Sequence, residues 1–255
     1  MKEQLYTIPL NDAVNAGDEC PFCYIERAIE QDQLDFVLGS GSSYMEADIR
    51  DMTDRAGFCR EHFKKMFDYG NTLGNAWILK THYLRTIGEM KKTFSSFKPG
   101  QASMKSIFRL SDDSASENSI SAWVNAREKS CFICKHFQDT YERYLDTFFY
   151  LYTKDSAFKD KIDNGKGFCL PHFGDLCTAA DSRLKGKDKE AFYKTILPLM
   201  ERNMERISED VSWMVDKFDY RNKDADWKNS KDAIQRGMQK LKGGYPADPT
   251  YKSSK

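Results

Sequence analysis

The sequence predicts an all-α protein, and three observations carry this prediction. Glycine and proline make up 22 of the 255 residues, about 9 %, against an average of about 12 %, so few residues interrupt helices. Apolar residues recur every three or four positions along the long segments, as on one face of a helix. No segment shows the sustained apolar–polar alternation that is typical of strands. Hydrophobic residues form 40 % of the chain, which is enough for a core and excludes wholesale disorder.

The first half of the chain, residues 1–97, is expected to contain four helices. The first begins at Pro21, because proline is favoured at the first position of a helix. The second extends from Tyr44 to Arg55, and Gly57 is placed to end it. The apolar face of the first helix comprises Ile25, Ile29, Phe36 and Val37.

The third helix is expected to begin near Cys59, and the fourth to extend from about Leu73 to Phe94. The third helix should bury Phe63, Met66 and Phe67. The fourth carries one apolar stripe, which consists of Trp77, Leu84, Ile87 and Phe94.

The second half, residues 120–220, follows the same plan. Four helices are expected in it. The first begins at Cys131, the second extends from about Ser156 to Ile162, the third begins near Cys169, and the fourth covers about Asp188 to Phe218. The short second helix should stop at Asn164-Gly165, and Pro198 should bend the long last one.

Two segments lie outside these halves. Residues 98–119 are rich in serine and poor in large apolar residues, which predicts a connector. Residues 221–255 carry nine Lys or Arg against four Asp. An amphipathic helix over 229–241 is expected to pack on the body, with a weak partner-binding tail as the alternative. Its apolar residues are Ile234, Met238 and Leu241.

The two halves are a weak internal repeat. Cys20-Pro-Phe-Cys23 and Cys131-Phe-Ile-Cys134 open the two copies, and a Gly-Phe-Cys-x-x-His-Phe string closes each one, over 57–63 and 167–173. The offset between the copies is 111 residues at the first pair and 110 at the second. Chance rarely places two such strings at matching distances, so the repeat predicts two equivalent sites.

Eight Cys and His side chains in the repeat have the spacing of metal ligands. Residues three apart share one face of a helix, so a Cys-x-x-Cys or Cys-x-x-His pair at a helix start brings two ligand atoms together. Two such pairs supply three thiolates and one imidazole, a known structural zinc set. The predicted ligands of two zinc ions are Cys20, Cys23, Cys59, His62, Cys131, Cys134, Cys169 and His172.

Two questions about these ligands stay open from the sequence. The two pairs are separated by 35 intervening residues in the first half and 34 in the second, so a set can form within each half or take one pair from each half. An iron–sulfur cluster competes with zinc, although a Cys3His set is less usual for it. A thioredoxin-type redox pair is disfavoured because no βαβ pattern surrounds the motif, and disulfides are disfavoured in a reducing compartment.

Other Cys, His and aromatic residues receive simpler interpretations. Cys177 has no counterpart in the first half and is expected to be a small buried residue. His82 and His136 are expected to be surface or packing residues. Four phenylalanines beside the ligands should wall the sites or belong to the general core, namely Phe58, Phe63, Phe168 and Phe173.

Charge and motifs exclude several functions. The chain has 39 Lys and Arg against 39 Asp and Glu, so no nucleic-acid partner is expected. No apolar run has the length of a membrane span and no signal-peptide core precedes Asp12, so a cytoplasmic protein is expected. Phosphate-loop, dinucleotide, zinc-protease and serine-hydrolase motifs are absent from the sequence, which favours a non-enzymatic role. Glu26, Glu30 and Asp32 are expected on a solvated helix face.

The paired motifs resemble an uncharacterised bacterial family that is known only as a domain of unknown function. The resemblance rests on the two Cys-x-x-Cys pairs, the two Gly-Phe-Cys-x-x-His-Phe strings and a late Trp227-x-Asn-Ser-Lys segment that continues to Leu241-Lys-Gly, and it covers nearly the whole chain. It implies metal binding and brings no activity.

Three functional hypotheses follow. The first is a non-enzymatic interaction or regulatory protein with two structural zinc ions and a protein partner. The second is a thiol-based redox or metal sensor, since oxidation of zinc-bound cysteines can release the metal. The third is an enzyme with an iron–sulfur cluster or an open metal site.

Overall fold

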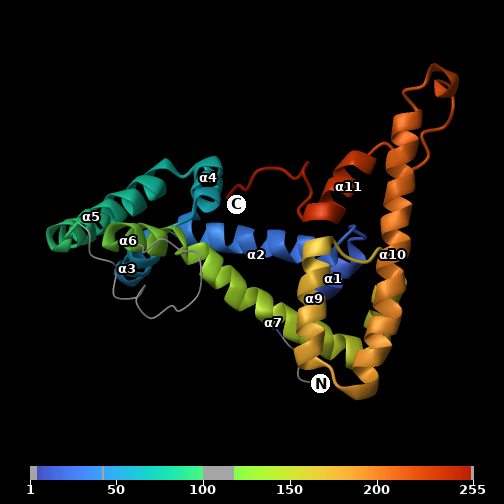
Figure 1. The fold of residues 1–255 in the computed structure, drawn as a ribbon, viewed down its shortest axis with the longest axis horizontal. Helices are drawn as coiled ribbons and strands as arrows, with labels where there is room; N and C mark the ends of the chain where they lie inside the picture. Colours follow the sequence, from blue (N-terminus) through green and yellow to red (C-terminus); the bar gives the residue numbers. More distant parts are fainter. Residues whose placement is uncertain (1–4, 42, 100–117, 254–255) are drawn as a thin grey trace. The chain divides into compact units, whose positions relative to one another are not determined.

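The computed structural model describes residues 5–41, 43–99 and 118–253 of the chain. In these ranges it contains eleven α-helices, two short 3-10 helices (Ser43–Met45 and Tyr220–Asn222) and no strand (Figure 1). The all-α prediction is therefore confirmed. Most of the predicted connector, residues 100–117, lies outside the described residues. No helix in the described part of the chain is both long enough and apolar enough to cross a bilayer.

The chain forms two compact units, and each combines segments from both sequence halves. Unit 1 comprises Met1–Ile29 and Asp139–Pro249, and unit 2 comprises Glu30–Gln138 and Thr250–Lys255. Two of the three boundaries between the units fall inside long helices, α2 (Pro21–Leu38) and α7 (Phe132–Lys154), and the third follows Pro249, after the last helix.

Unit 1 contains the following elements besides its parts of α2 and α7: α1 (Thr7–Asn15), α8 (Ser156–Asp163), α9 (Leu170–Arg183), α10 (Gly186–Asp216) and α11 (Ala233–Lys242). An aromatic cluster forms its core, since the rings of Phe22, Phe148 and Phe168 are buried with centroids 5.5–6.1 Å apart. Asp155 begins α8 by accepting hydrogen bonds from two backbone amides of the first turn. The last helix, α11, contacts both α9 and α10 (Figure 1).

Unit 2 contains the following elements besides its parts of α2 and α7: α3 (Ala47–Ala56), α4 (Arg60–Tyr69), α5 (Thr72–Ser96) and α6 (Ser119–Glu128). The core gathers buried residues of α2, α4, α5 and α7, such as Leu34, Met66, Ile78 and Ile133. Gly57 ends α3 with a φ of 64° and packs against the ring of His82, so a side chain at this position would be strained and would clash.

The predicted helices are present, with differences in extent and orientation. Two observed helices, α1 and α6, were not expected from the sequence, and α6 begins at Ser119, the last residue of the predicted connector. Phe67 was expected in the core but is 79 % exposed, because α4 buries the opposite face through His62, Met66 and Tyr69. On α5 the predicted stripe is also largely exposed, since the buried positions of that helix are Gly74 and Ile78.

The orientation of α11 also differs from the expectation. Its apolar residues Ile234, Met238 and Leu241 are about half exposed. The buried residues are instead Ala233, Gln239 and Lys240, which face α9, α10 and the start of α2. The polar side chains of Gln239 and Lys240, together with buried Ala233, therefore hold α11 within unit 1.

Candidate metal centres

The eight predicted ligands all lie at helix starts. Cys59 and Cys169 are the N-cap residues of α4 and α9, and a histidine follows each of them within the first turn. The two Cys-x-x-Cys pairs lie at the first turns of α2 and α7. Backbone amides at a helix start favour an anionic sulfur, so these positions suit thiolate ligands.

The first ligand set, set 1, consists of Cys20, Cys23, Cys169 and His172 and lies in unit 1. The Nδ1 atom of His172 lies 3.4, 3.6 and 3.1 Å from the sulfurs of Cys20, Cys23 and Cys169. The sulfurs of Cys23 and Cys169 are 3.7 Å apart. All four residues are buried.

The second ligand set, set 2, consists of Cys59, His62, Cys131 and Cys134 and lies in unit 2. The Nδ1 atom of His62 lies 3.2, 3.3 and 3.4 Å from the sulfurs of Cys59, Cys131 and Cys134. The sulfurs of Cys59 and Cys134 are 3.8 Å apart. Set 2 is more accessible than set 1, because Cys134 is exposed and Cys59 is partly exposed.

These distances fit a tetrahedral metal ion. Zinc–sulfur bonds of about 2.3 Å and zinc–nitrogen bonds of about 2.0–2.1 Å place sulfurs roughly 3.8 Å apart and sulfur roughly 3.5 Å from nitrogen. In each set the four ligand atoms lie within 4.8 Å of one another. Each set could therefore hold one metal ion without a large movement of its ligands.

Each set combines one ligand pair from the first sequence half with one pair from the second. The Cys-x-x-Cys pair of α2 faces the Cys-x-x-His pair of α9. In the same way, the Cys-x-x-Cys pair of α7 faces the Cys-x-x-His pair of α4. Of the two pairings that the sequence left open, the exchanged one is thus the one observed. A sequence half contains only parts of two sets.

A carboxylate lies behind each histidine. The Nε2 atom of His172 is 3.6 Å from Glu26, and that of His62 is 3.5 Å from Glu30. A carboxylate near Nε2 favours the tautomer with its proton on Nε2, which would leave the Nδ1 lone pair available to a metal ion. The expectation that Glu26 and Glu30 lie on a purely solvated face is wrong, although Asp32 is exposed. Glu26 and Glu30 follow Cys23 by three and seven residues on one helix, and this spacing could have indicated from the sequence that both carboxylates lie on the same helix face as Cys23.

The surroundings of Glu30 strengthen its negative charge. Lys65 forms an ion pair with it, and the hydroxyl of Tyr251 donates a hydrogen bond of 2.5 Å. Although burial opposes ionisation, contacts with His62, Lys65 and Tyr251 lower the pKa of Glu30 to about 2. This carboxylate is ionised throughout the neutral range and can orient the histidine of set 2.

The two sets differ in electrostatics. In set 1, burial raises the pKa of Cys20 to about 12 and lowers the pKa of His172 to about 4. In set 2, burial is outweighed by the contact between Cys131 and His62, which lowers the pKa of the thiol to about 6 and raises that of the imidazole to about 10. A cation bound at set 1 would compensate the charge of thiolates that burial otherwise disfavours.

The remaining Cys, His and Phe residues lie outside the sets. Phe58 and Phe168 are buried, as expected for walls, and Phe168 belongs to the aromatic core of its unit. His136 packs on the ring of Phe132 with centroids 4.4 Å apart, which agrees with a packing role. Cys177 is partly exposed rather than buried, so the expectation of a buried residue is wrong.

Comparison with known proteins places the chain in a family. Residues 1–248 match a family described as a family of unknown function (DUF6062). The chain belongs to this family. No curated protein and no solved structure matches the chain. The sequence resemblance to a family of unknown function is thereby confirmed, and the two Cys3His sets described above are features of this DUF6062 protein.

Proposed function

We propose that this DUF6062 protein is a non-enzymatic interaction or regulatory protein in which each Cys3His set holds one structural zinc ion. The observation that supports this most is the spacing of the ligand atoms, which matches the edges of a zinc tetrahedron in both sets. Three sulfurs and one nitrogen fill the four positions, whereas a catalytic zinc keeps one for water. We expect the protein to act in the cytoplasm, where thiols remain reduced, and to bind a protein partner.

The first prediction concerns metal content. The purified chain should contain two zinc ions, since two complete ligand sets are present. Elemental analysis after anaerobic purification checks this, with thiol titration as the control for oxidised cysteines. A zinc content below one per chain with all thiols reduced would contradict the proposal. A brown protein with sulfur-to-iron absorbance would favour the iron–sulfur alternative.

A second candidate function is a redox sensor, and the accessibility of set 2 favours it. Oxidants attack exposed thiolates first, and Cys134 is exposed whereas the cysteines of set 1 are buried. A sensor would release the zinc of set 2 and keep that of set 1.

This difference gives a second prediction. Under mild peroxide treatment, about one zinc per chain should be released, and mass spectrometry should find the oxidised residues in set 2. A zinc-binding dye follows the release, and a reductant should reverse it. Simultaneous loss of both ions, or no loss at all, would exclude a sensor based on set 2.

A further inference from the structure

Unit 1 contains a large pocket that neither ligand set uses. Its volume is about 930 Å³, within the usual size range of small-molecule sites. It lies between the α1–α2 junction, the turn that joins α8 to α9, the middle of α10 and the segment before α11. These four segments are distant in sequence, so the pocket depends on the fold of this unit.

The lining of the pocket is strongly basic. Seven lysine or arginine side chains line it, against three acidic ones, Asp18, Glu19 and Asp232. This local excess stands in a chain whose formal net charge is zero. Positive charge gathered in a concave site raises the local concentration of anions.

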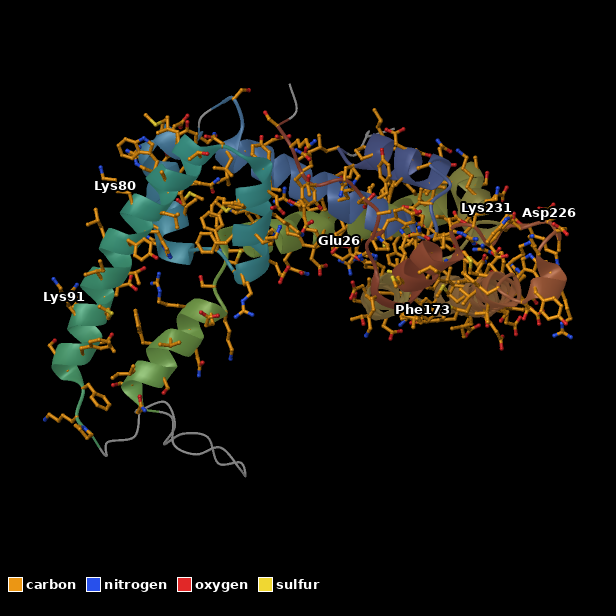
Figure 2. The ribbon with its side chains drawn as sticks, turned by 90° about the horizontal axis from the view of Figure 1, so that it is seen from above. Glu26, Lys80, Lys91, Phe173, Asp226 and Lys231 are labelled. Carbon is orange, nitrogen blue, oxygen red and sulfur yellow. The ribbon has the colours of Figure 1, made fainter. Side chains whose placement is uncertain are left out.

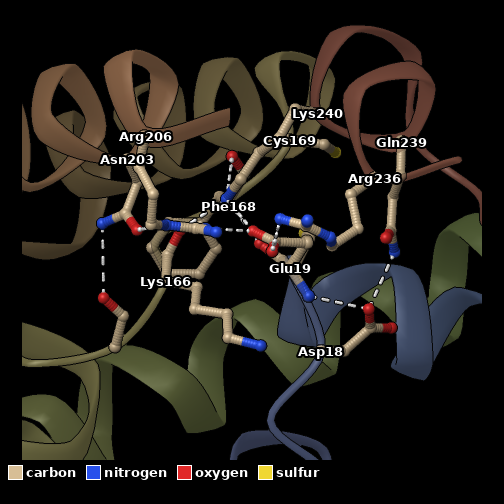
Figure 3. Close-up of polar contacts among 12 residues, drawn as sticks. Asp18, Glu19, Lys166, Phe168, Cys169, Asn203, Arg206, Arg236, Gln239 and Lys240 are labelled. Carbon is tan, nitrogen blue, oxygen red and sulfur yellow. Dashed lines mark hydrogen bonds and ion pairs between the residues drawn. The ribbon is translucent and has the colours of Figure 1, made fainter. Parts of the chain in front are cut away.

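The three acidic side chains already have partners inside the protein. Glu19 is 2 % exposed and lies 2.5 Å from Arg206, 3.3 Å from Lys240 and 3.6 Å from Arg236 (Figure 3). Asp18 accepts hydrogen bonds from Gln239 and from the amide of Glu19, and Asp232 pairs with Arg236. These acids position the cations and leave little negative charge for the pocket itself.

Several of the basic side chains that line the pocket have no acidic partner or have unused hydrogen-bond donors. Arg202 and Lys231 are exposed and have no hydrogen-bond or ion-pair partner among the described residues. Lys161 and Lys166 donate only to neutral oxygens, the side chain of Asn15 and the carbonyl of Gly17. Lys231 lies at the surface of unit 1, before α11 (Figure 2).

Arg206 supplies an ordered guanidinium at the pocket. Its Nε donates to Asn203 over 3.1 Å and its Nη2 to Glu19, while Nη1 makes no hydrogen bond within the described part of the chain. Asn203 is in turn held by bonds to the carbonyls of Leu199 and Gly165. A guanidinium fixed on one side presents its remaining donors in a defined direction, which suits a phosphate oxygen.

We propose that this pocket binds a phosphate-bearing small molecule. Its cations outnumber its acids by four, which matches a compact ligand with several negative charges, and its volume accommodates a molecule of nucleotide size. This site is distinct from set 1, because none of the eight candidate ligands lines it, although Glu19, Pro21 and Phe168 of its lining adjoin Cys20 and Cys169 in the chain.

The test uses pyrophosphate and ADP as probes, with calorimetry on the zinc-loaded full chain at low salt. We expect at least one probe to bind with saturation at one per chain. The double variant Arg202→Gln, Lys231→Gln should weaken its binding at least about tenfold. The unfolding temperature should not change, since neither side chain has a partner in the described structure. Equal binding of both probes would indicate recognition of phosphate alone, and tighter binding of ADP would indicate a nucleotide site.

A matched control removes two exposed lysines of α5, in the double variant Lys91→Gln, Lys92→Gln; Figure 2 labels Lys91 on this helix. It loses the same charge in the other unit and should bind as the natural chain does. Zinc content is measured before and after titration, because phosphates can chelate the metal. Absence of saturable binding for both probes would overturn the proposal. Equal weakening in the control, or citrate binding as tight as that of the better phosphate probe, would also overturn it.

Discussion

Replacing Cys169 by serine should remove one of two zinc ions and destabilise unit 1 strongly. A hydroxyl is a poor zinc ligand, so the three remaining side chains of set 1 would hold an incomplete shell. Because binding of a structural metal contributes directly to the free energy of folding, the loss should be several kcal/mol, well above the ~1 kcal/mol of a typical point substitution. Elemental analysis and chemical denaturation with excess zinc measure both effects.

Cys177→Ser is the matched control for this variant. Cys177 lies on the same helix, α9, but outside the set, and it is partly exposed. The variant should retain both ions and lose about 1 kcal/mol or less, since the hydroxyl can reach water. If Cys177→Ser lost zinc while Cys169→Ser kept it, the composition of set 1 would be wrong.

Glu19→Gln should be the most destabilising substitution away from the ligands. Glu19 is the only acidic partner within ion-pair distance of Lys240 in the described structure, and both side chains are almost fully buried. The variant leaves a buried ammonium without a counter-charge, which costs about 3–5 kcal/mol in comparable sites. Denaturant unfolding measures the loss, and zinc analysis verifies that both ions remain.

Two further variants isolate the cause. Adding Lys240→Met to Glu19→Gln removes the uncompensated charge, so the double variant should be more stable than the sum of the single losses predicts. Asp181→Asn breaks the exposed pair with Lys189 and should cost no more than about 1 kcal/mol. If the losses in the double variant were additive, the uncompensated charge of Lys240 would not be the cause of the stability lost in Glu19→Gln.

The Glu19 carboxylate also makes the stability of the chain depend on pH in the acidic range. Burial alone would raise the pKa of Glu19, but the hydrogen bond from Arg206 and the charge of Lys240 hold it below its ordinary value. A carboxylate with a lowered pKa in the folded state stabilises that state above its unfolded pKa. This contribution is lost as the pH falls through the folded value. Glu19→Gln should therefore flatten the acid limb of the stability profile.

The sequence predicts nine of the eleven helices in the described ranges and the eight side chains that the structure gathers into two sets, because both are local patterns. Helical periodicity and the three-residue spacing of each pair need no knowledge of distant contacts. The pairing of the sets was not predictable, since Cys20 meets His172 across 152 residues and the spacing of the pairs allows either partner. The buried network was also not predictable, because Glu19 looks like a surface acid in sequence and its partners Arg206 and Lys240 are 187 and 221 residues away.

Burial of individual side chains was predictable only in part. The pattern marks Phe67 and Leu84 as apolar positions, but which face of α4 or α5 meets the core depends on the neighbouring helices. On α11 the apolar residues are the exposed ones, because the inward positions satisfy backbone carbonyls and carboxylates at the start of α2. Periodicity identifies a helix and leaves its rotation to tertiary structure.

The exchanged ligand sets have a consequence for synthesis of the protein. During translation, a nascent chain that has emerged only as far as residue 97 contains four candidate ligands, yet these belong to two different incomplete sets. Set 2 is first complete when Cys134 is available, and set 1 only when His172 is. If the sets bind metal as proposed, their native loading follows synthesis of the second half, and set 2 can be filled before set 1 exists.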